Sequence, residues 1–393
     1  MKICGVIAEY NPFHNGHMYQ LAEARRLSGC DFLIVVMGGA FSQRGEPILL
    51  DKWTRTRMAL QHGADLVVEL PALFAVRSAD WFARGGVETL AALGADSICF
   101  GCETDNLPLL NRTLDLMTVE DDALKEAIRV RLAEGQAHVR ARGEALAERL
   151  NIPADFVSRP NTALALEYMR ANRALTRPMD VHIVLRTGSY HDETLTAMAS
   201  ASAIRAAVSR GDIAAARASM PASAYEMLNR ASPGALSDIN RLDALLIDRL
   251  RMLSLEGISS LPDVSEGLEH RVFQCAQQAG SRNALLSLLK CKRYTHARLS
   301  RLLAHALLGM TSEMCLRHPS PEYARVLGFR KDAAALLTRL KDTPLPLISR
   351  ASLLRENEIF ALERRATDLQ SLAFGEETLR AAGRDLTEKI VIE

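Results

Sequence analysis

The sequence predicts an α/β domain built on a parallel sheet, followed by a mainly helical C-terminal domain. In the first two hundred residues, short apolar runs alternate with stretches of helical periodicity, as in a parallel sheet with helices on both faces. The runs are apolar at nearly every position, which is typical of strands buried on both sides. After about residue 205 they disappear, and short helical segments punctuated by proline dominate. We therefore predict two domains, residues 1–205 and 206–393.

Five strands and four helical stretches account for the N-terminal domain. The apolar runs that we expect to be strands cover residues 3–8, 32–37, 66–70, 97–101 and 181–185. Helical periodicity covers residues 17–27, 52–62, 119–150 and 162–171. This alternation is Rossmann-like, with the usual strand order 3-2-1-4-5 and a ligand crevice at the carboxyl ends of the strands. The second helix begins with a charged group that we expect to be exposed, namely Asp51, Lys52, Arg55 and Arg57.

Composition indicates a globular protein of the cytoplasm. Hydrophobic residues make up 48% of the 393 and charged residues 24%, which argues against a disordered chain. No run approaches the roughly 20 apolar residues that span a bilayer, and we recognise no signal peptide. Seven cysteines at irregular spacing favour reduced thiols. Cys99 and Cys102 form a lone CxxC pair, which we interpret as buried thiols rather than a redox or zinc motif.

The segment His14-Asn15-Gly16-His17 follows the first predicted strand directly. A helical pattern begins at His17, so we interpret Asn15 as the start of a helix and not as part of a hairpin. A helix N-terminus in this crevice presents free N–H groups and positive potential to an anion. Two imidazoles three residues apart lie on one side of a helical turn and would bind a triphosphate, with Gly16 allowing close approach. The alternative is a pair of surface histidines in a loop.

These residues resemble a known family. The HxGH pattern is similar to that of the HIGH-type nucleotidyltransferase superfamily, whose members use attack on the α-phosphorus of ATP. The longer segments 9–17 (EYNPFHNGH) and 37–47 (MGGAFSQRGEP) resemble the tRNA-Met cytidine acetate ligase family. Further segments are similar to that family, in the same order along about three quarters of the chain: 100–103 (FGCE), 160–164 (PNTAL), 186–192 (RTGSYHD), 200–205 (SASAIR), 266–269 (EGLE) and 290–295 (KCKRYT).

The resemblance implies an ATP-dependent ligase that forms acetyl-adenylate from acetate and ATP, with Mg2+ helping pyrophosphate to leave. It implies transfer of the acetyl group to N4 of the wobble cytidine, position 34, of elongator tRNA-Met. His14 and His17 would be the catalytic residues. The resemblance and the predicted crevice together indicate an ATP site formed by Ile7, Asn11, Pro12, Phe13, His14, Gly16, His17, Gln20, Gly101, Asn161, Arg186, Thr187, Ser200 and Arg205.

Several of these residues have an ordinary structural alternative. Gly101 would be a simple turn glycine, Asn161 a helix cap, and Arg186 a surface ion-pair partner. Ser200 and Arg205 would serve in helix capping rather than in closing over pyrophosphate. The segment 200–205 also departs from the superfamily's second signature, because it lacks the lysines found there. We expect no metal ligands from the protein itself.

A basic segment in the helical half suggests an RNA surface. Residues 281–310 contain six Lys and Arg residues and no Asp or Glu, in a chain whose formal net charge is only +1. Tyr294 and two histidines lie among them. Such a surface suits an RNA backbone and an unstacked base, although a solvated helix face is the alternative. The residues that we expect to bind RNA are Lys290, Lys292, Arg293, Arg298 and Arg301.

Two other functions remain open at the level of sequence. A small-molecule adenylyltransferase would share the HxGH segment, although it would not need the basic helical domain. A non-catalytic protein that binds nucleotide and RNA would not need both histidines. Oligomeric state does not follow from the sequence.

Overall fold

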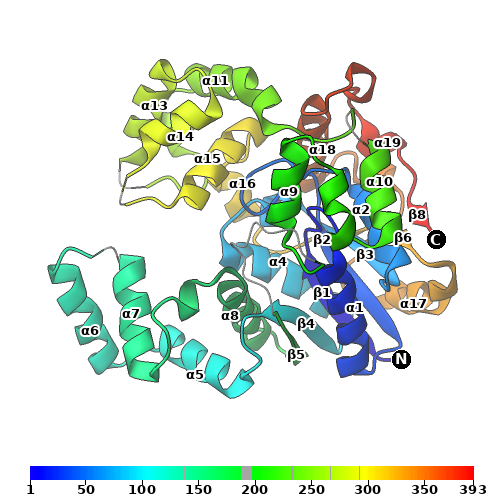
Figure 1. Cartoon of the computed structure of the whole chain (residues 1–393), viewed down its shortest axis with the longest axis horizontal. Helices are drawn as coiled ribbons and strands as arrows, with labels where there is room; N and C mark the ends of the chain where they lie inside the picture. Colours follow the sequence, from blue (N-terminus) through cyan, green and yellow to red (C-terminus); the bar gives the residue numbers. More distant parts are fainter. Residues whose placement is uncertain (137, 187–196, 232–233, 266, 292) are drawn as a thin grey trace.

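A mostly parallel sheet forms the centre of the computed structural model, which describes all residues except 137, 187–196, 232–233, 266 and 292 (Figure 1). The strands are β1 (Ile3–Ala8), β2 (Phe32–Gly38), β3 (Leu66–Leu70), β4 (Ser97–Cys102), β5 (Asp180–Leu185), β6 (Ala324–Phe329), β7 (Leu347–Ile348) and β8 (Val391–Ile392). Their order is β5-β4-β1-β2-β3-β6-β7, and β8 pairs with β6. The Rossmann-like order of the first five strands, which are parallel, is confirmed.

The C-terminal half returns to this sheet. β6 pairs with β3 in antiparallel orientation, and β7 and β8 then pair with β6. The expectation that strands end near residue 205 is therefore wrong. The sequence pattern did not show these later strands because β6 is a single short run and β7 and β8 have only two residues each. Residues after 205 are still mainly helical. Their division from residues 1–205 as a separate domain stays a prediction.

Helices cover both faces of the sheet. Apolar side chains of β1 and β2 on one face pack against α1 (Asn15–Ser28), α2 (Lys52–Gln61), α9 (Ala201–Ser209) and α10 (Ala222–Ala231). The opposite face packs against α3 (Ala72–Ala75), α4 (Ala79–Ala92), α8 (Pro160–Arg173) and α18 (Glu358–Leu372). The carboxyl ends of β1, β4 and β5 remain between these layers, where a Rossmann-like fold binds its ligand.

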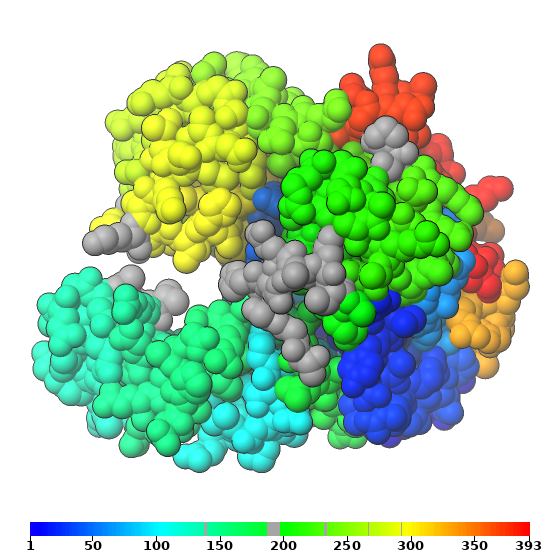
Figure 2. All heavy atoms as spheres, viewed as in Figure 1, coloured from blue at the N-terminus to red at the C-terminus, as the bar shows by residue number. Residues whose placement is uncertain are grey.

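Two groups of helices project from the sheet domain. One comprises α5 (Leu107–Thr118), α6 (Asp122–Ala133) and α7 (His138–Leu150), so the predicted stretch 119–150 is two helices with Gly135 between them at φ +84°. The other comprises α11 (Asp243–Met252), α12 (Leu255–Ser259), α13 (Leu268–Gln278), α14 (Arg282–Leu289) and α15 (His296–Leu308). Figure 2 shows an open hollow between the two groups. In the described part of the chain, no helix is long and apolar enough to cross a membrane.

Short helices complete the C-terminal half. They are α16 (Ser312–Arg317), α17 (Ala334–Arg339) and α19 (Arg384–Thr387). Helix α19 and strand β8 run beside α2, so the last residues of the chain lie against its N-terminal part (Figure 1).

Candidate active site

Helix α1 begins at Asn15 with His14 as its N-cap, as the sequence indicates. The Nδ1 atom of His14 accepts a hydrogen bond from the Gly16 N–H at 3.0 Å, and Nδ1 of His17 accepts one from the His14 N–H at 3.3 Å. The two rings stack with centroids 3.7 Å apart. Because each Nδ1 is an acceptor, each neutral ring carries its proton on Nε2. The pair therefore offers two Nε2–H donors.

The same contacts correct the expected role of the helix N-terminus. The N–H groups of Gly16 and His17 are already bonded to His14, so they are not free for an anion. A Cβ atom on Gly16 would lie 2.8 Å from Cε1 of His14, so the glycine is required by the histidine cap. Anion binding at this position therefore depends on the imidazole rings and on neighbouring arginines.

Both histidines are neutral in this environment. Burial, together with the charges of Arg186 and Arg205, lowers the pKa of His14 to about 3. Burial, His14 and Arg186 hold the pKa of His17 well below its ordinary value. Positive charge at the site is therefore carried by the guanidinium groups, while the imidazoles act as uncharged donors.

A pocket of about 50 Å³ opens beside the His14 ring, and His17 is not among the residues that line it. Side chains and backbone from α1, β4, β5 and the start of α9 form its wall, namely His14, Gly16, Tyr19, Gln20, Gly101, Val184, Leu185, Arg186, Met198 and Ser200. The structure thus gathers six residues of the predicted ATP site around one cavity, although they are up to 186 positions apart in sequence.

Four predicted residues lie buried beneath the pocket instead of lining it, namely Ile7, Asn11, Pro12 and Phe13. The side-chain oxygen of Asn11 accepts a hydrogen bond from the Leu49 N–H at 3.0 Å, and its carbonyl accepts one from Nη1 of Arg205 at 2.7 Å. These contacts hold the loop between β1 and α1 in place. Direct contact of the four residues with ATP stays a prediction. Thr187 lies outside the described residues.

Glu103, which follows β4, holds the start of α8 beside the pocket. Its Oε1 accepts from the N–H and Nδ2 of Asn161 at 3.1 and 2.7 Å, and its Oε2 from the N–H and Oγ1 of Thr162 at 2.6 and 2.8 Å. Helix α8 begins at Pro160 with Arg159 as N-cap, so the interpretation of Asn161 as a cap is wrong. The Asn161 Oδ1 instead accepts from Arg186 Nη1 at 3.3 Å.

Gly101 lies inside strand β4, paired with Val184, so it is not a turn glycine. A Cβ atom there would lie 3.2 Å from Cγ and Cδ of Arg186, which means that the arginine side chain passes across the glycine. Ser200 does cap α9, since its Oγ accepts from the Ala203 N–H at 3.2 Å, and it also lines the pocket. Ser200 is therefore confirmed as a helix cap. It also lines the pocket, as expected for a residue of the site.

The charged start of α2 is largely buried, contrary to expectation. Lys52 and Arg55 have no exposed surface, whereas the Arg57 side chain is 45% exposed. Arg55 donates hydrogen bonds to the carbonyl oxygens of Leu50, Glu9, Gly38 and Gly39, and so fixes the loops after β1 and β2. Lys52 lies within an ion-pair cluster that also contains Glu69, Arg325, Glu363 and Asp385.

The predicted RNA residues divide into exposed and buried ones. Lys290 and Arg293 are exposed, where α14 ends and before α15 begins. Arg298 lies over the Tyr294 ring and donates to the Asp263 carbonyl at 2.8 Å. Arg301 is only 9% exposed, so it is not part of an exposed basic face. Lys292 lies outside the described residues.

Metal ligands are not evident around the pocket. In the described part of the chain, no group of three or more His, Cys, Asp or Glu side chains is arranged to hold a metal ion. Cys99 and Cys102 are buried free thiols, which confirms their interpretation. The pocket offers imidazole and guanidinium groups rather than the carboxylates that Mg2+ prefers. Mg2+ that accompanies a nucleotide would be held mainly by phosphates and water, and its participation stays a prediction.

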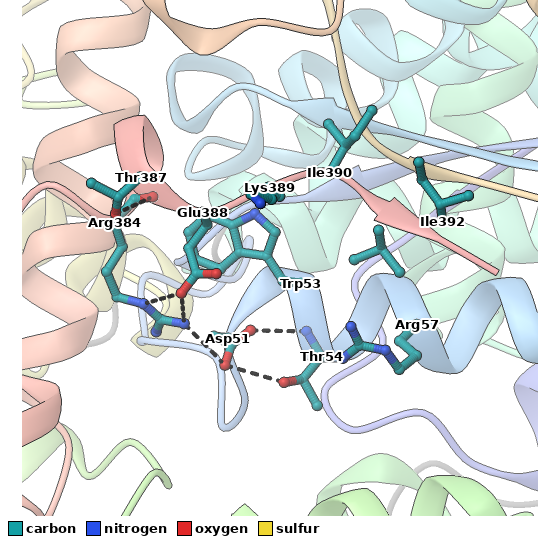
Figure 3. Close-up of a pocket in the computed structure, with 11 residues that line it drawn as sticks. Asp51, Trp53, Thr54, Arg57, Arg384, Thr387, Glu388, Lys389, Ile390 and Ile392 are labelled. Carbon is teal, nitrogen blue, oxygen red and sulfur yellow. Dashed lines mark hydrogen bonds and ion pairs between the residues drawn. The ribbon is translucent and has the colours of Figure 1, made fainter.

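A second hollow, of about 490 Å³, lies between α2 and the C-terminal segment (Figure 3). Two of its three cations, Arg57 and Arg384, already have carboxylate partners. Arg384 pairs with Glu388 at 2.9 Å and with Asp51 at 3.6 Å, and Arg57 pairs with Glu393 at 3.1 Å. None of the predicted site residues lines it. We therefore interpret it as the place where the C-terminal segment packs against α2.

Comparison with known proteins agrees with this geometry. The HIGH Nucleotidyl Transferase family model matches residues 1–385. The tRNA(Met) cytidine acetate ligase of Acetivibrio thermocellus is 36% identical, with 100% of both chains covered, and that of Geobacillus sp. is 35% identical, with 96% of both covered. Two crystal structures of Thermotoga maritima TmcAL are 30% identical and cover 100% of this chain and 99% of theirs. The apo form has a TM-score of 0.91, and the form bound with alpha-thio ATP has 0.90.

Proposed function

Because this chain belongs to the HIGH nucleotidyltransferase family and to the tRNA(Met) cytidine acetate ligases within it, we propose that it acetylates the wobble cytidine of elongator tRNA-Met. ATP and acetate would first form acetyl-adenylate and pyrophosphate. The N4 amine of cytidine 34 would then take the acetyl group and release AMP. An exocyclic amine conjugated with its ring is a poor nucleophile, so acetate needs this activation.

The pair of neutral imidazoles at the start of α1 carries the proposal. When an acetate oxygen attacks the α-phosphorus, negative charge develops on the non-bridging oxygens. Donors that are fixed before the reaction stabilise such charge without reorganising. The Nε2–H groups of His14 and His17 are fixed by their Nδ1 hydrogen bonds and by ring stacking.

Arginines would hold the remaining phosphates. Arg186 lines the pocket and is bonded to Asn161, which Glu103 fixes in turn. Arg205, from α9, reaches the loop between β1 and α1 through Asn11. Both guanidinium groups lie close enough to His14 to lower its pKa, so they bring positive charge to the same site. Arginine forks suit phosphate oxygens.

The tRNA would approach from the hollow between the two groups of helices. The exposed Lys290 and Arg293 supply positive charge between α14 and α15 of the second group. The loop after β2 links α14 and α15 to the sheet, because Ser300 donates to the Arg44 carbonyl at 2.6 Å and Arg282 pairs with Glu46 at 3.0 Å. A tRNA held on these helices would therefore lie next to the loops that surround the pocket.

Incubation of tRNA with labelled acetate and ATP, followed by nucleoside analysis, tests the proposal. We expect the label in N4-acetylcytidine of elongator tRNA-Met only, and only when ATP is present. If no nucleoside is labelled, and if ATP is consumed only when a small-molecule acceptor other than acetate is present, the small-molecule adenylyltransferase is favoured.

A further inference from the structure

Glu9 stands at the carboxyl end of β1, directly before the loop that leads to His14. Its Oε1 accepts a hydrogen bond from the Gln43 N–H at 2.5 Å, and its Cγ packs 3.9 Å from the Cβ position of Gly38. Its other oxygen, Oε2, makes no hydrogen bond and no ion pair with the described residues. The side chain is half-buried. One carboxylate oxygen is thus anchored, and the second is left to accept a proton.

The surroundings of Glu9 favour proton uptake more than those of an ordinary carboxylate. Burial raises its pKa, and this effect outweighs the opposing hydrogen bond from Gln43 and the charges of three arginines. These are Arg205 from α9, Arg55 from α2 and Arg44 from the loop after β2. The phenol of Tyr168, from α8, also lies within the range of the Glu9 charge. A base whose pKa approaches the working pH is well suited to catalysis.

Glu9 also lies between the two substrates of the proposed reaction. On one side, Arg205 faces both the Glu9 carboxylate and the His14 ring. On the other, Gln43 belongs to the loop that contacts α14 and α15 through Glu46 and Arg44. Glu9 does not itself line the pocket, but through Arg205 it borders the His14 side, and through Gln43 it borders the loop that contacts the helical group.

Other candidates for a general base are already occupied. His14 and His17 use Nδ1 to accept backbone hydrogen bonds and carry their protons on Nε2. Both carboxylate oxygens of Glu103 already accept hydrogen bonds from Asn161 and Thr162. Glu69 is fully buried in the ion-pair cluster around Lys52. Of Glu9, Glu69 and Glu103, only Glu9 has an oxygen without a hydrogen bond or ion pair to the described residues.

We propose that Glu9 is the general base of acetyl transfer, an assignment that rests on the proposed function. The N4 nitrogen attacks the carbonyl carbon of acetyl-adenylate, and a C–N bond forms. The bond between that carbon and the phosphate oxygen breaks, and AMP leaves with the electron pair. The proton lost by N4 moves to Oε2 of Glu9 and then to solvent. No oxidant or further reactant is needed.

The substitution Glu9→Gln tests the assignment, because it keeps the shape and removes the base. We expect transfer from preformed acetyl-adenylate to tRNA to fall by about 10²–10⁴-fold, the usual contribution of general-base catalysis. Acetate-dependent ATP–pyrophosphate exchange should change only a few-fold, which shows that the variant is folded. Glu23→Gln, on the surface of α1, is the matched control and should change neither. Unchanged transfer, or an equal loss of both steps, overturns the assignment.

A second measurement uses the unaltered enzyme and does not depend on the folding of a variant. The single-turnover rate of transfer should rise with pH through an apparent pKa above the ordinary carboxylate value of 4.5, since the base must be ionised. A rate that is independent of pH between about 5 and 9 would overturn the assignment. Absence of acetate-dependent exchange in the wild type would instead refute the proposed function, so the two failures are distinguishable.

Discussion

The chemistry of the site depends at the residue scale on the protonation of two histidines. Burial and nearby arginines lower the pKa of both His14 and His17, so the two imidazoles are neutral and not cationic. Their Nδ1 hydrogen bonds then determine which nitrogen faces the ligand. The HxGH spacing predicted the position of these rings. It did not predict their tautomer, because that depends on backbone geometry at the helix start.

His17→Ala should lower the kcat of acetate-dependent exchange by about 10²–10³-fold, as expected for the loss of one fixed donor at a developing charge. His17→Gln, whose amide N–H lies near the position of Nε2, should retain more of the activity. His270→Ala, on the surface of α13, controls for nonspecific loss. Equal activities of the Gln and Ala variants would show that the Nε2–H donor is not what matters.

At the scale of elements, the sequence predicted a strand or helix well where neighbouring residues alone determine it. All five N-terminal strands and the start of α1 follow from apolar runs and from the residues around His14. The buried position of Lys52 could not be predicted in this way. Its partners Glu363 and Asp385 are more than 300 residues away in sequence, so the start of α2 looks like an ordinary charged face. The helix-cap alternative for Asn161 was wrong for a similar reason, because its partner Glu103 lies at the end of another strand.

The ion-pair cluster joins α2, β3 and α18 and contains more carboxylates than cations. Glu69, Glu363 and Asp385 face only Lys52 and Arg325. Burial and the neighbouring Glu69 raise the pKa of Glu363 to about 8, so it is protonated in the folded protein at neutral pH. A protonated carboxyl at this position balances the charges of the cluster.

Glu363→Gln should therefore change how folding stability depends on pH. In the unfolded chain Glu363 ionises near pH 4.5, whereas in the folded protein it keeps its proton up to about pH 8. Its contribution to stability is complete below pH 4.5 and is lost as pH rises towards 8. Between pH 4.5 and 8, the free energy of unfolding of the wild type should fall by on the order of a few kcal/mol relative to that of the variant. Urea unfolding at several pH values measures the difference.

A parallel dependence on pH in Glu363→Gln and the wild type would show that Glu363 is ionised in the folded protein. Glu226→Gln, on the surface of α10, is the matched control for the loss of a carboxylate.

At the scale of the whole molecule, we propose that the sheet domain binds the nucleotide and that the helical groups bind RNA. The basic composition of residues 281–310 led to the expectation of an RNA surface, and it overestimated how much of the positive charge is exposed. Arg282 and Arg301 are buried, and Arg282 pairs with Glu46 of the loop after β2. Part of the basic segment therefore fastens the helices to the sheet domain. Sequence composition does not distinguish such cations from exposed ones.

Replacement of both Lys290 and Arg293 by Ala should weaken tRNA binding and leave acetate-dependent exchange unchanged. Log affinity falls as log salt concentration rises, and each lost phosphate contact makes this slope less steep by roughly 1. Filter binding at several salt concentrations measures this slope. The variant Arg230→Ala with Lys331→Ala removes the same charge from other exposed positions and should keep the wild-type slope. An equal effect of both double variants would indicate a general charge effect.

The most direct test of the account is ATP–pyrophosphate exchange measured with and without acetate, in the absence of tRNA. The pocket beside His14 predicts exchange that requires acetate and that does not depend on any RNA. Exchange that needs a different acceptor would contradict acetate activation. No exchange with any acceptor would mean that the fixed imidazole donors only bind nucleotide and that the chain does not catalyse nucleotidyl transfer.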